Sequence, residues 1–321
     1  MLINLVSYLN SSKFNGGGEL VNNVLINKGI ERGHRFLFTT ARNRNSEFST
    51  KADLDLLIDI HNYPHTLKSR GASVTLPLPI LSEITTNRPF VHMTNAYADV
   101  CNLPYLPCSG DSKNKCVHKS NLKLVDKITN RDFKESCFAI NPLVKQAYVN
   151  SIMNVYVSPL HKAITNKIIN YNDEIKSLVL KPIIDTIKFK AQDIHRDIDY
   201  LFVGVISEAK GFFNLKHLPY KDEIVFVGDI HPKIKLDFGK YLGKLPYAEI
   251  PNLMNRAKNF VFLPRWPEPQ GRVVVEAALM GCNLIVNDNV GATTFPFDLA
   301  DPNNYEDSAD IFWDEIEKLA L

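Results

Sequence analysis

Short apolar runs alternate with stretches of helical periodicity from the start of the chain. Leu2 to Leu9 is apolar and strand-like, a glycine-rich stretch follows, and apolar residues then recur at helical spacing from Leu20 until Gly33. A second strand is expected at Arg35 to Thr39. Strand, glycine loop, helix and strand in this order are typical of the opening of a parallel, doubly wound sheet.

The first half of the chain continues this alternation. Further strands are expected at Leu54 to Ile60, Phe90 to Met93, Asn154 to Ser158 and Ser177 to Leu180, with a helix at His161 to Ile169. Polar residues follow two of these strands, His61-Asn62 and Thr94-Asn95. Strand ends of this type face the cleft of an open α/β sheet.

A second unit of the same kind follows a charged, poorly periodic stretch at Lys181 to Asp197. Its strands are expected at Asp199 to Val205, Glu223 to Val227, Asn259 to Leu263 and Asn283 to Val286, and its helices at Tyr247 to Lys258 and Ser308 to Leu319. The pattern therefore predicts an α/β protein of two Rossmann-like domains that face a cleft, residues 1–185 and 186–321.

Composition narrows the class. The chain has 321 residues, 45% of them hydrophobic and 22% charged, which suits two soluble domains. No apolar run approaches the ~18 residues that span a bilayer, and no basic flank precedes Leu2, so a cytoplasmic protein is expected. The net charge of +2 argues against a surface that tracks nucleic acid throughout. An odd count of 5 cysteines argues against a disulfide framework.

The segment Pro264 to Gly281 carries the candidate chemistry. Glu268 and Glu276 flank a helix start at Gly271-Arg272, and an apolar run follows. A helix start presents free N–H groups and the positive end of its dipole, and a guanidinium adds a bidentate donor, so a diphosphate would bind well there. Glu276 could accept ribose hydroxyls and Glu268 sugar hydroxyls. The alternative is an ordinary surface loop with an acidic helix start.

This segment resembles the signature of Glu, seven residues and Glu in retaining glycosyltransferases of the GT-B fold, family four. The resemblance implies that Glu268 touches the donor sugar and that Glu276 touches the nucleotide ribose. The run Gly16-Gly17-Gly18 lacks the G-x-G-x-x-G spacing of dinucleotide-binding proteins. It resembles the first glycine loop of the same family, which implies that Gly17 and Gly18 approach the donor diphosphate.

Gly204 to Gly211, G-V-I-S-E-A-K-G, is similar to a loop of the same family with the form G-R-L-x-x-E-K-G. The resemblance implies that Lys210 neutralises the leaving diphosphate. Without the flanking glycines, Lys210 would be interpreted as a solvated lysine. Val205 stands where the family has arginine. Either Arg272, or with less support Arg265, supplies the missing charge, or the activity is weakened.

The family also uses a His-Asp pair of the first domain to touch the donor sugar, and no such pair stands at that point here. Matching the strand end favours His92, whereas aligning on Cys101 places Asn95-Ala96 there. His61 is a weaker candidate. A lone histidine at a strand end is more often packed or capping than catalytic.

A polar insertion from about Ala98 to Glu135 lies between the domain's strands. In it and next to it are four cysteines and one histidine, residue types that can bind zinc: Cys101, Cys108, Cys116, His118 and Cys137. Their spacing lacks a C-x-x-C pair, so these cysteines are interpreted as ordinary small residues and no metal is expected. The insertion is the best candidate for acceptor contact, and its lysines either attract an anionic acceptor or stay solvated: Lys113, Lys115, Lys119 and Lys123.

Together these features predict transfer of a sugar from a nucleoside diphosphate sugar to an acceptor hydroxyl, with retention and without a metal or other cofactor. The predicted catalytic residues are Glu268, Lys210, Arg272 and His92. The predicted donor-binding residues are Gly17, Gly18, Lys210, Gly271, Arg272 and Glu276. A glycosidase, a sugar-nucleotide epimerase and a non-catalytic sugar-nucleotide-binding protein are the alternatives, and the acceptor is a glycan, a lipid or a modified DNA base.

The end of the chain departs from the family. The last predicted helix, Ser308 to Leu319, ends sooner than the family's chains usually do. The customary helix that returns onto the first domain is therefore expected to be shortened or absent.

Overall fold

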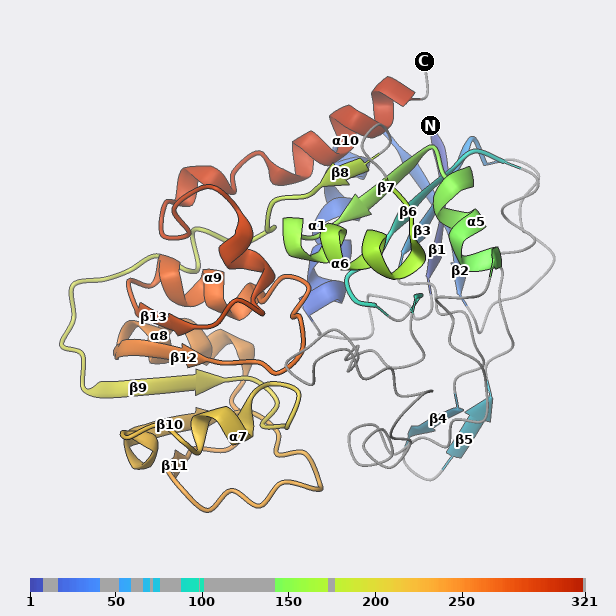
Figure 1. Ribbon diagram of the computed structural model, residues 1–321. Helices are drawn as coiled ribbons and strands as arrows, with labels where there is room; N and C mark the ends of the chain where they lie inside the picture. Colours follow the sequence, from blue (N-terminus) through green and yellow to red (C-terminus); the bar gives the residue numbers. More distant parts are fainter. Residues whose placement is uncertain are drawn as a thin grey trace.

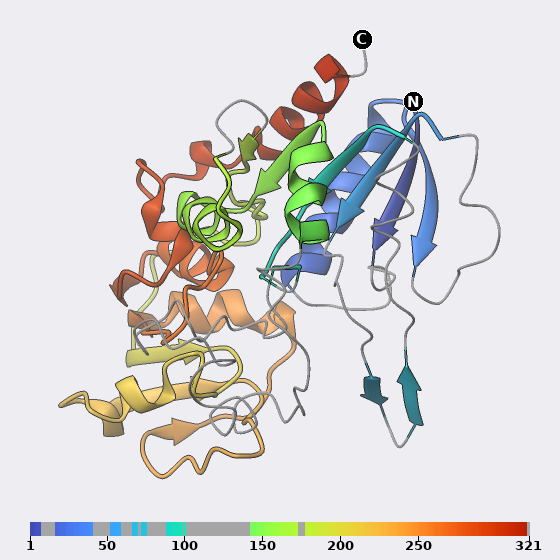
Figure 2. The ribbon, with the colours of Figure 1, turned by 45° about the vertical axis from the view of Figure 1, so that its right-hand side comes forward.

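The structure, a computed structural model, describes residues 1–7, 17–40, 52–58, 66–69, 72–75, 88–97, 99–100, 142–172 and 177–319. These residues form two parallel sheets, each flanked by helices (Figures 1 and 2). A separate antiparallel pair, β4 (Thr66–Ser69) and β5 (Ala72–Thr75), lies apart from both sheets in Figure 2. The two predicted α/β units are confirmed as two sheets.

The first sheet has six parallel strands in the order β2-β1-β3-β6-β7-β8. The strands are β1 (Leu2–Ser7), β2 (Arg35–Thr40), β3 (Leu54–Ile58), β6 (Phe90–Met93), β7 (Met153–Tyr156) and β8 (Ser177–Val179). Its helices are α1 (Gly17–Glu31), α5 (Pro142–Asn150) and α6 (Pro159–Ile169). Leu5 of β1 pairs with Phe38 on one side and Leu56 on the other. This sheet and these helices are called the first unit below.

The second sheet has five parallel strands in the order β11-β10-β9-β12-β13. The strands are β9 (Ile198–Val203), β10 (Ile224–Val227), β11 (Lys240–Tyr241), β12 (Ala257–Phe262) and β13 (Asn283–Val286). Its helices are α7 (Phe212–Leu215), α8 (Ile250–Asn255) and α9 (Arg272–Leu279), and short 3-10 turns are η3 (Lys221–Glu223), η4 (Tyr247–Glu249), η5 (Gly291–Thr294) and η6 (Pro302–Asn304). This is the second unit. The single helix predicted for Tyr247 to Lys258 is in fact η4 and α8, and Ala257 already belongs to β12.

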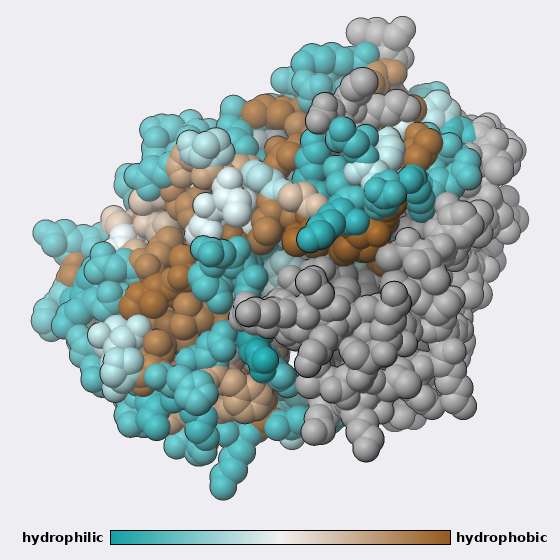
Figure 3. Space-filling model, viewed as in Figure 1, coloured by the Kyte–Doolittle hydropathy of each residue, from teal (hydrophilic) through white to brown (hydrophobic). Residues whose placement is uncertain are grey.

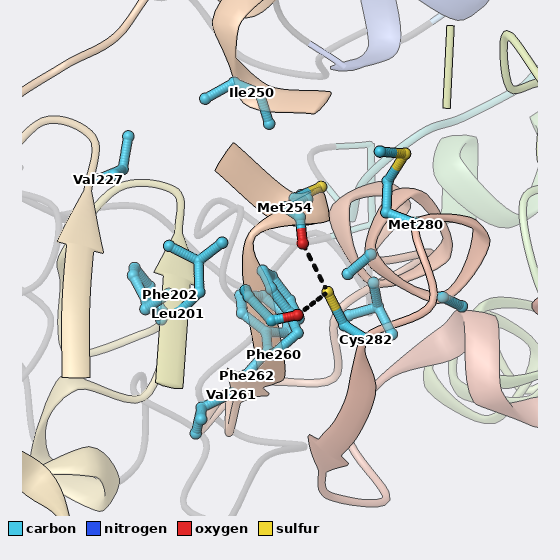
Figure 4. Close-up of a cluster of buried hydrophobic side chains, with 14 of the residues drawn as sticks. Leu201, Phe202, Val227, Ile250, Met254, Phe260, Val261, Phe262, Met280 and Cys282 are labelled. Atoms are coloured by element: carbon cyan, nitrogen blue, oxygen red, sulfur yellow. Dashed lines mark hydrogen bonds between the residues drawn. The ribbon is translucent and has the colours of Figure 1, made fainter. Parts of the chain in front are cut away.

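The core of the second unit is apolar on both faces of β12. Phe260, Val261 and Phe262 are consecutive and all buried, as expected for a strand covered on both sides (Figure 4). Cys282 lies at the edge of this cluster, where its Sγ is 3.2 Å from the Met254 carbonyl oxygen. Burial raises the pKa of the Cys282 thiol to about 11, so this thiol packs as a small apolar group.

The edge strand β13 is only partly covered. Leu284, Ile285 and Val286 are half-buried, and none of the described strands pairs with the outer side of β13. In Figure 3, hydrophobic atoms gather on the left of this face, over the region of α9 and β13. The other visible described surface of the second unit is mostly hydrophilic.

The chain passes between the units without regular structure. No helix or strand is assigned between β8 and β9, where the sequence predicts a linker. Ile183 packs into the core of the first unit, and the next residue, Ile184, packs into the core of the second. The chain therefore passes from one core to the other between residues 183 and 184, two residues before the predicted boundary between residues 185 and 186.

The last helix, α10 (Ser308–Leu319), returns to the first unit (Figure 1). Phe312 and Trp313 are fully buried in its core, and the Trp313 indole N–H donates to the Leu25 carbonyl oxygen of α1 at 2.8 Å. Gly29 makes room for this ring, since a Cβ there would lie 2.5 Å from it. A return helix of 12 residues is therefore present, so the expectation that it could be absent is wrong, and by packing this segment belongs to the first unit.

Candidate functional site

Two helices from different units begin next to one another. An added Cβ on Gly17, the first residue of α1, would lie 4.0 Å from Cδ of Arg272, the first residue of α9. Gly271 precedes α9 with a φ of 77°, a left-handed conformation that favours glycine. Each helix start carries free N–H groups and partial positive charge. A group placed between them therefore meets positive potential from both units.

Arg272 adds a cation to this junction, with 15% of its side chain exposed. Its Nε donates to Glu276 Oε1 at 2.8 Å, and its Nη2 donates to the Tyr247 hydroxyl at 3.2 Å. Its Nη1 is buried, and no described residue accepts a hydrogen bond from it. Burial alone would lower the pKa of Arg272, but Glu276 and Tyr247 raise it, and the net direction is upward. The guanidinium is therefore charged, and its Nη1 amino group, which carries two N–H donors, is left for a ligand.

Glu276 is held in place by its neighbours. Its side chain lies on α9 with 3% of the residue exposed, and Oε1 also accepts from the Tyr247 hydroxyl at 2.7 Å. Burial, followed by the charge of Glu276, raises the pKa of Tyr247, so the phenol keeps its proton and donates. The Lys188 ammonium lies 3.8 Å from the centre of the Tyr247 ring. The carboxylate thus has a fixed orientation beside Arg272.

Glu268 and Lys210 form an ion pair. Lys210 Nζ lies 2.5 Å from Glu268 Oε2, and it also lies 5.1 Å from the centre of the Trp266 ring. The backbone of Glu268 is fixed from both sides, because its N–H donates to the Asn289 carbonyl at 2.7 Å and its carbonyl accepts from the Gly291 N–H at 3.0 Å. The structure therefore brings these two predicted residues together.

The loop that carries Glu268 rests against the first unit. The Ser158 hydroxyl donates to the Pro269 carbonyl oxygen, and Gln270 Nε2 donates to the Val157 carbonyl oxygen at 2.9 Å. Gly291 is needed at this contact, since a Cβ there would overlap the Pro269 carbonyl and approach Ser158. These contacts place the start of α6 directly beside the predicted site.

Gly17 and Gly18 were predicted in a glycine loop, whereas they are the first two residues of α1. Gly17 is exposed and faces Arg272, whereas Gly18 is half-buried against Asn95, whose Nδ2 would be 3.3 Å from an added Cβ. Six of the predicted residues therefore lie in one region at the junction of the units: Gly17, Gly18, Lys210, Glu268, Gly271 and Arg272. Glu276 joins them through its bond to Arg272.

His92 has a different environment. It is 1% exposed, its ring packs edge-on against Tyr148 at 4.6 Å between centroids, and Nε2 lies 3.4 Å from Asp99 Oδ2 without hydrogen-bond geometry. Burial lowers the pKa of His92 to about 4, so the ring is neutral. Its ring contact with Tyr148 and its approach to Asp99 both lie within the first unit. This environment favours a packing role over the predicted catalytic one, and His61 lies outside the described residues.

Three aromatic residues of the site were missed by the sequence patterns. Tyr97 is fully buried, with its ring edge-on to His161 at 5.0 Å and to Trp266 at 6.2 Å between centroids. Tyr247 holds Glu276. Tyr97 follows the polar strand end at Thr94-Asn95, and Trp266 lies inside the carboxylate segment, so adjacency along the chain was the available signal for these two. No sequence pattern marks Tyr247.

Two arginines were predicted to replace the charge that is absent at Val205, and the structure distinguishes between them. Val205 is 43% exposed and brings no charge. Arg265 is committed to Glu208, with Nη1 2.9 Å from Oε1. Of the two proposed substitutes, Arg272 is the one at the junction of the units.

The remaining expectations concern metals and the polar insertion. Cys101, Cys108, Cys116, His118 and Cys137 lie outside the described residues, as do Lys113, Lys115, Lys119 and Lys123. The described ranges contain no cluster of three or more histidine, cysteine or acidic side chains arranged to hold a metal ion. Within the same ranges, no helix combines the length and apolar character needed to cross a membrane.

Comparisons with known proteins support the fold. No protein-family model matches the chain, and no curated protein matches it significantly by sequence. Solved structures do match over 100% of this chain. Anabaena HepE in complex with UDP-glucose has a TM-score of 0.56 at 14% identity over 92% of its length. An alpha-glucosyltransferase in complex with UDP and a 13-mer DNA containing an HMU base has a TM-score of 0.51 at 10% identity over 90% of its length. The chain has the GT-B fold of these structures, with two Rossmann-like units.

Proposed function

We propose that this protein transfers a sugar from a nucleoside diphosphate sugar to an acceptor hydroxyl. The observation that carries the proposal is the meeting of the α1 and α9 starts around Arg272, whose buried Nη1 has no described partner. A buried donor without a partner is costly, so an acceptor there is strongly favoured. A diphosphate supplies several charged acceptors at once, as helix starts and guanidinium groups prefer.

The two carboxylates fit the remaining parts of such a donor. Glu276 lies within the first two turns of α9, behind Arg272, and would accept hydroxyls of the nucleotide ribose. Glu268 lies in the loop before Arg272 and would accept hydroxyls of the transferred sugar. In the structure Glu268 is paired with Lys210. An arriving diphosphate competes for Lys210, and this exchange frees the Glu268 carboxylate for the sugar.

The chemistry then depends on the charge of the leaving group. The bond between the anomeric carbon and the diphosphate breaks, a bond from that carbon to the acceptor oxygen forms on the same face, and the acceptor proton passes to the leaving phosphate. Negative charge builds on the diphosphate as it leaves, and fixed cations and N–H groups lower the barrier. Lys210, Arg272 and the two helix starts supply that charge, so we propose retention without a metal.

UDP-glucose is the first donor to test, because HepE was solved with it and the alpha-glucosyltransferase with UDP. Binding is measured as the rise in melting temperature with UDP-, GDP- and ADP-sugars, which grows with RT ln(1 + [L]/Kd). Transfer is then measured with glycan, lipid and hydroxymethylated DNA acceptors. We expect one nucleotide series to stabilise the protein and one acceptor to be glycosylated.

Arg272→Ala gives the matched test of the site, with Arg256→Ala as its control. Arg256 is an exposed arginine of the same unit that pairs with Asp197. Arg272→Ala should abolish the nucleotide-induced rise, and Arg256→Ala should keep it. Equal rises in both variants, or no rise in the unmodified protein, would refute the diphosphate site.

A protein that binds sugar nucleotides without transferring the sugar is the second candidate. Val205 and the buried His92 favour it, because two polar groups of the family pattern have no counterpart at the junction. A stabilising nucleotide sugar with neither transfer nor slow hydrolysis would select this candidate. Transfer to any of the three acceptor classes would exclude it.

A further inference from the structure

The hydroxyl of Tyr97 is buried without a hydrogen-bond partner among the described residues. The residue is 0% exposed, and no described residue forms a hydrogen bond with the hydroxyl. Buried hydroxyl groups normally have a partner, because they lose their bonds to water on folding. A phenylalanine would fill the same space without this penalty. The hydroxyl therefore points to a partner that arrives from outside the chain.

The ring of Tyr97 is held in one orientation. It packs edge-on against His161 of the first unit and Trp266 of the second. His161 is itself fixed, because its Nδ1 accepts from the Val157 N–H at 3.3 Å and its Nε2 lies 3.2 Å from the Ala96 carbonyl oxygen. Burial lowers the pKa of His161 to about 3, so the ring is neutral and Nε2 is the nitrogen that donates. Tyr97 is thus clamped between the units, as a positioned binding group must be.

Glu268 identifies the chemistry of the missing partner. The Tyr97 ring packs edge-on against Trp266, and the Trp266 ring lies 5.1 Å from the Lys210 ammonium that pairs with Glu268. Burial, followed by the charge of Glu268, raises the pKa of Tyr97, so the phenol is protonated. A phosphate oxygen could accept from the phenol, but it has no proton to donate to Glu268. A hydroxyl can accept from Tyr97 and donate to Glu268 at the same time.

We propose that Tyr97 binds a hydroxyl of the transferred sugar and selects that sugar together with Glu268. This rests on the proposed function and adds a substrate-contacting residue from the first unit. The charged residues of the second unit grip the diphosphate and the ribose, whereas Tyr97 meets the part of the donor that is transferred.

Tyr97→Phe tests the proposal because it removes only the hydroxyl. Binding of UDP-, GDP- and ADP-glucose and of the three free nucleoside diphosphates is measured by calorimetry for this variant and the unmodified protein. For the nucleotide that binds, Tyr97→Phe should weaken the glucose form about tenfold, as expected for one lost hydrogen bond, and leave the free diphosphate unchanged. The melting temperature without ligand should stay the same or rise.

Tyr305→Phe is the matched control. Tyr305 is also buried, but its hydroxyl donates to the Leu299 carbonyl oxygen at 2.8 Å within the second unit. This variant should lower the melting temperature and leave the affinity ratio between the sugar nucleotide and the free nucleotide unchanged. The ratio thus separates sugar contact from a general loss of stability.

Four results overturn the proposal. If Tyr97→Phe weakens binding of the sugar nucleotide and of the free nucleotide equally, the hydroxyl contacts the diphosphate. If it weakens neither, the partner of the hydroxyl is a buried water. A melting temperature that falls as in Tyr305→Phe reveals a structural partner. If the unmodified protein binds none of the six ligands, the proposed function itself fails, and the assignment of Tyr97 fails with it. This outcome differs from the other three because it is observed in the unmodified protein.

Discussion

The two units meet at one site but bring different chemistry to it. The second unit contributes charged side chains, namely Lys210, Glu268, Arg272 and Glu276, which already pair with one another. The first unit contributes the exposed backbone of Gly17 and the neutral side chains of Tyr97 and His161. The difference assigns separate tasks. Under the proposed function, one side would bind the charged part of the ligand, and the other would contact its neutral part.

The units also differ in how their cores are built. The buried core of the second unit draws on residues 184–305 alone, whereas that of the first unit is completed by α10 from the far end of the chain. The neutral side of the site therefore depends on a distant segment for its support. The charged side does not.

Trp313→Ala should have the largest effect, because it removes the ring that joins α10 to α1. Replacing a buried tryptophan by alanine typically costs about 3–5 kcal/mol, and here the hydrogen bond to Leu25 is lost as well. We expect the free energy of unfolding, measured with urea by circular dichroism, to fall by about that amount. The loss should appear in the unfolding of the first unit.

Leu319→Ala on the same helix is the control, since Leu319 is an exposed residue of α10. It should change the urea midpoint little. If Trp313→Ala were as mild as this control, the first unit would not depend on α10, and the contrast between the two cores would be lost.

The fold was largely predictable from sequence because its strands are short, apolar and separated by helical periodicity. The strand at Phe90 to Met93 and the helix at Ser308 to Leu319 were predicted with the bounds that the structure shows. The packing partner of that helix was not. Amphipathic spacing shows that a helix has a buried face but does not identify the surface that covers it. The close approach of Trp313 to Gly29 is a tertiary fact without a local signal.

The site was predictable where residues lie close along the chain. Glu268, Gly271, Arg272 and Glu276 fall within nine positions, and a single turn and helix bring them together. Lys210 was found through a loop resemblance. Tyr247 escaped prediction because its bond to Glu276 spans 29 positions. His92 was predicted from its place at a strand end, but whether a strand end is open or buried depends on packing that the sequence does not reveal.

Lys210→Ala tests whether the second unit carries the charge of the reaction. Removing one group that stabilises developing charge typically costs about 3 kcal/mol, more than a hundredfold in rate. We expect kcat to fall by that factor with a smaller change in KM for the donor. Lys216→Ala is the matched control, because Lys216 pairs with Asp237 at the surface of the same unit. Equal kcat values in both variants would contradict the role of Lys210.

Glu276→Gln should have a smaller effect, and on binding instead of turnover. The amide keeps one acceptor for Tyr247 but removes the charge that faces Arg272 and the ribose. We expect KM for the donor to rise about tenfold, or about 1.4 kcal/mol, with kcat nearly unchanged. Glu315→Gln, which alters a partly exposed glutamate of α10 paired with Lys318, should leave both constants unchanged. A fall in kcat with constant KM would move Glu276 from the ribose to the reacting centre.

The smallest effect should be the change in stability on lowering the pH, at the contact between α10 and the first unit. The hydrogen bond from Arg32 lowers the pKa of Glu317 to about 2, and His34 contributes further. A lowered pKa in the folded state stabilises the protein above the ordinary glutamate value and loses that contribution as pH falls toward 2. Glu317 is partly exposed and Arg32 also pairs with Asp310 and Asp314, so the effect should stay below about 1 kcal/mol. Glu317→Gln should therefore unfold at slightly lower urea than the unmodified protein at pH 7 and at the same urea near pH 2. A constant difference across that range would show that Glu317 supports α10 by packing and not by charge.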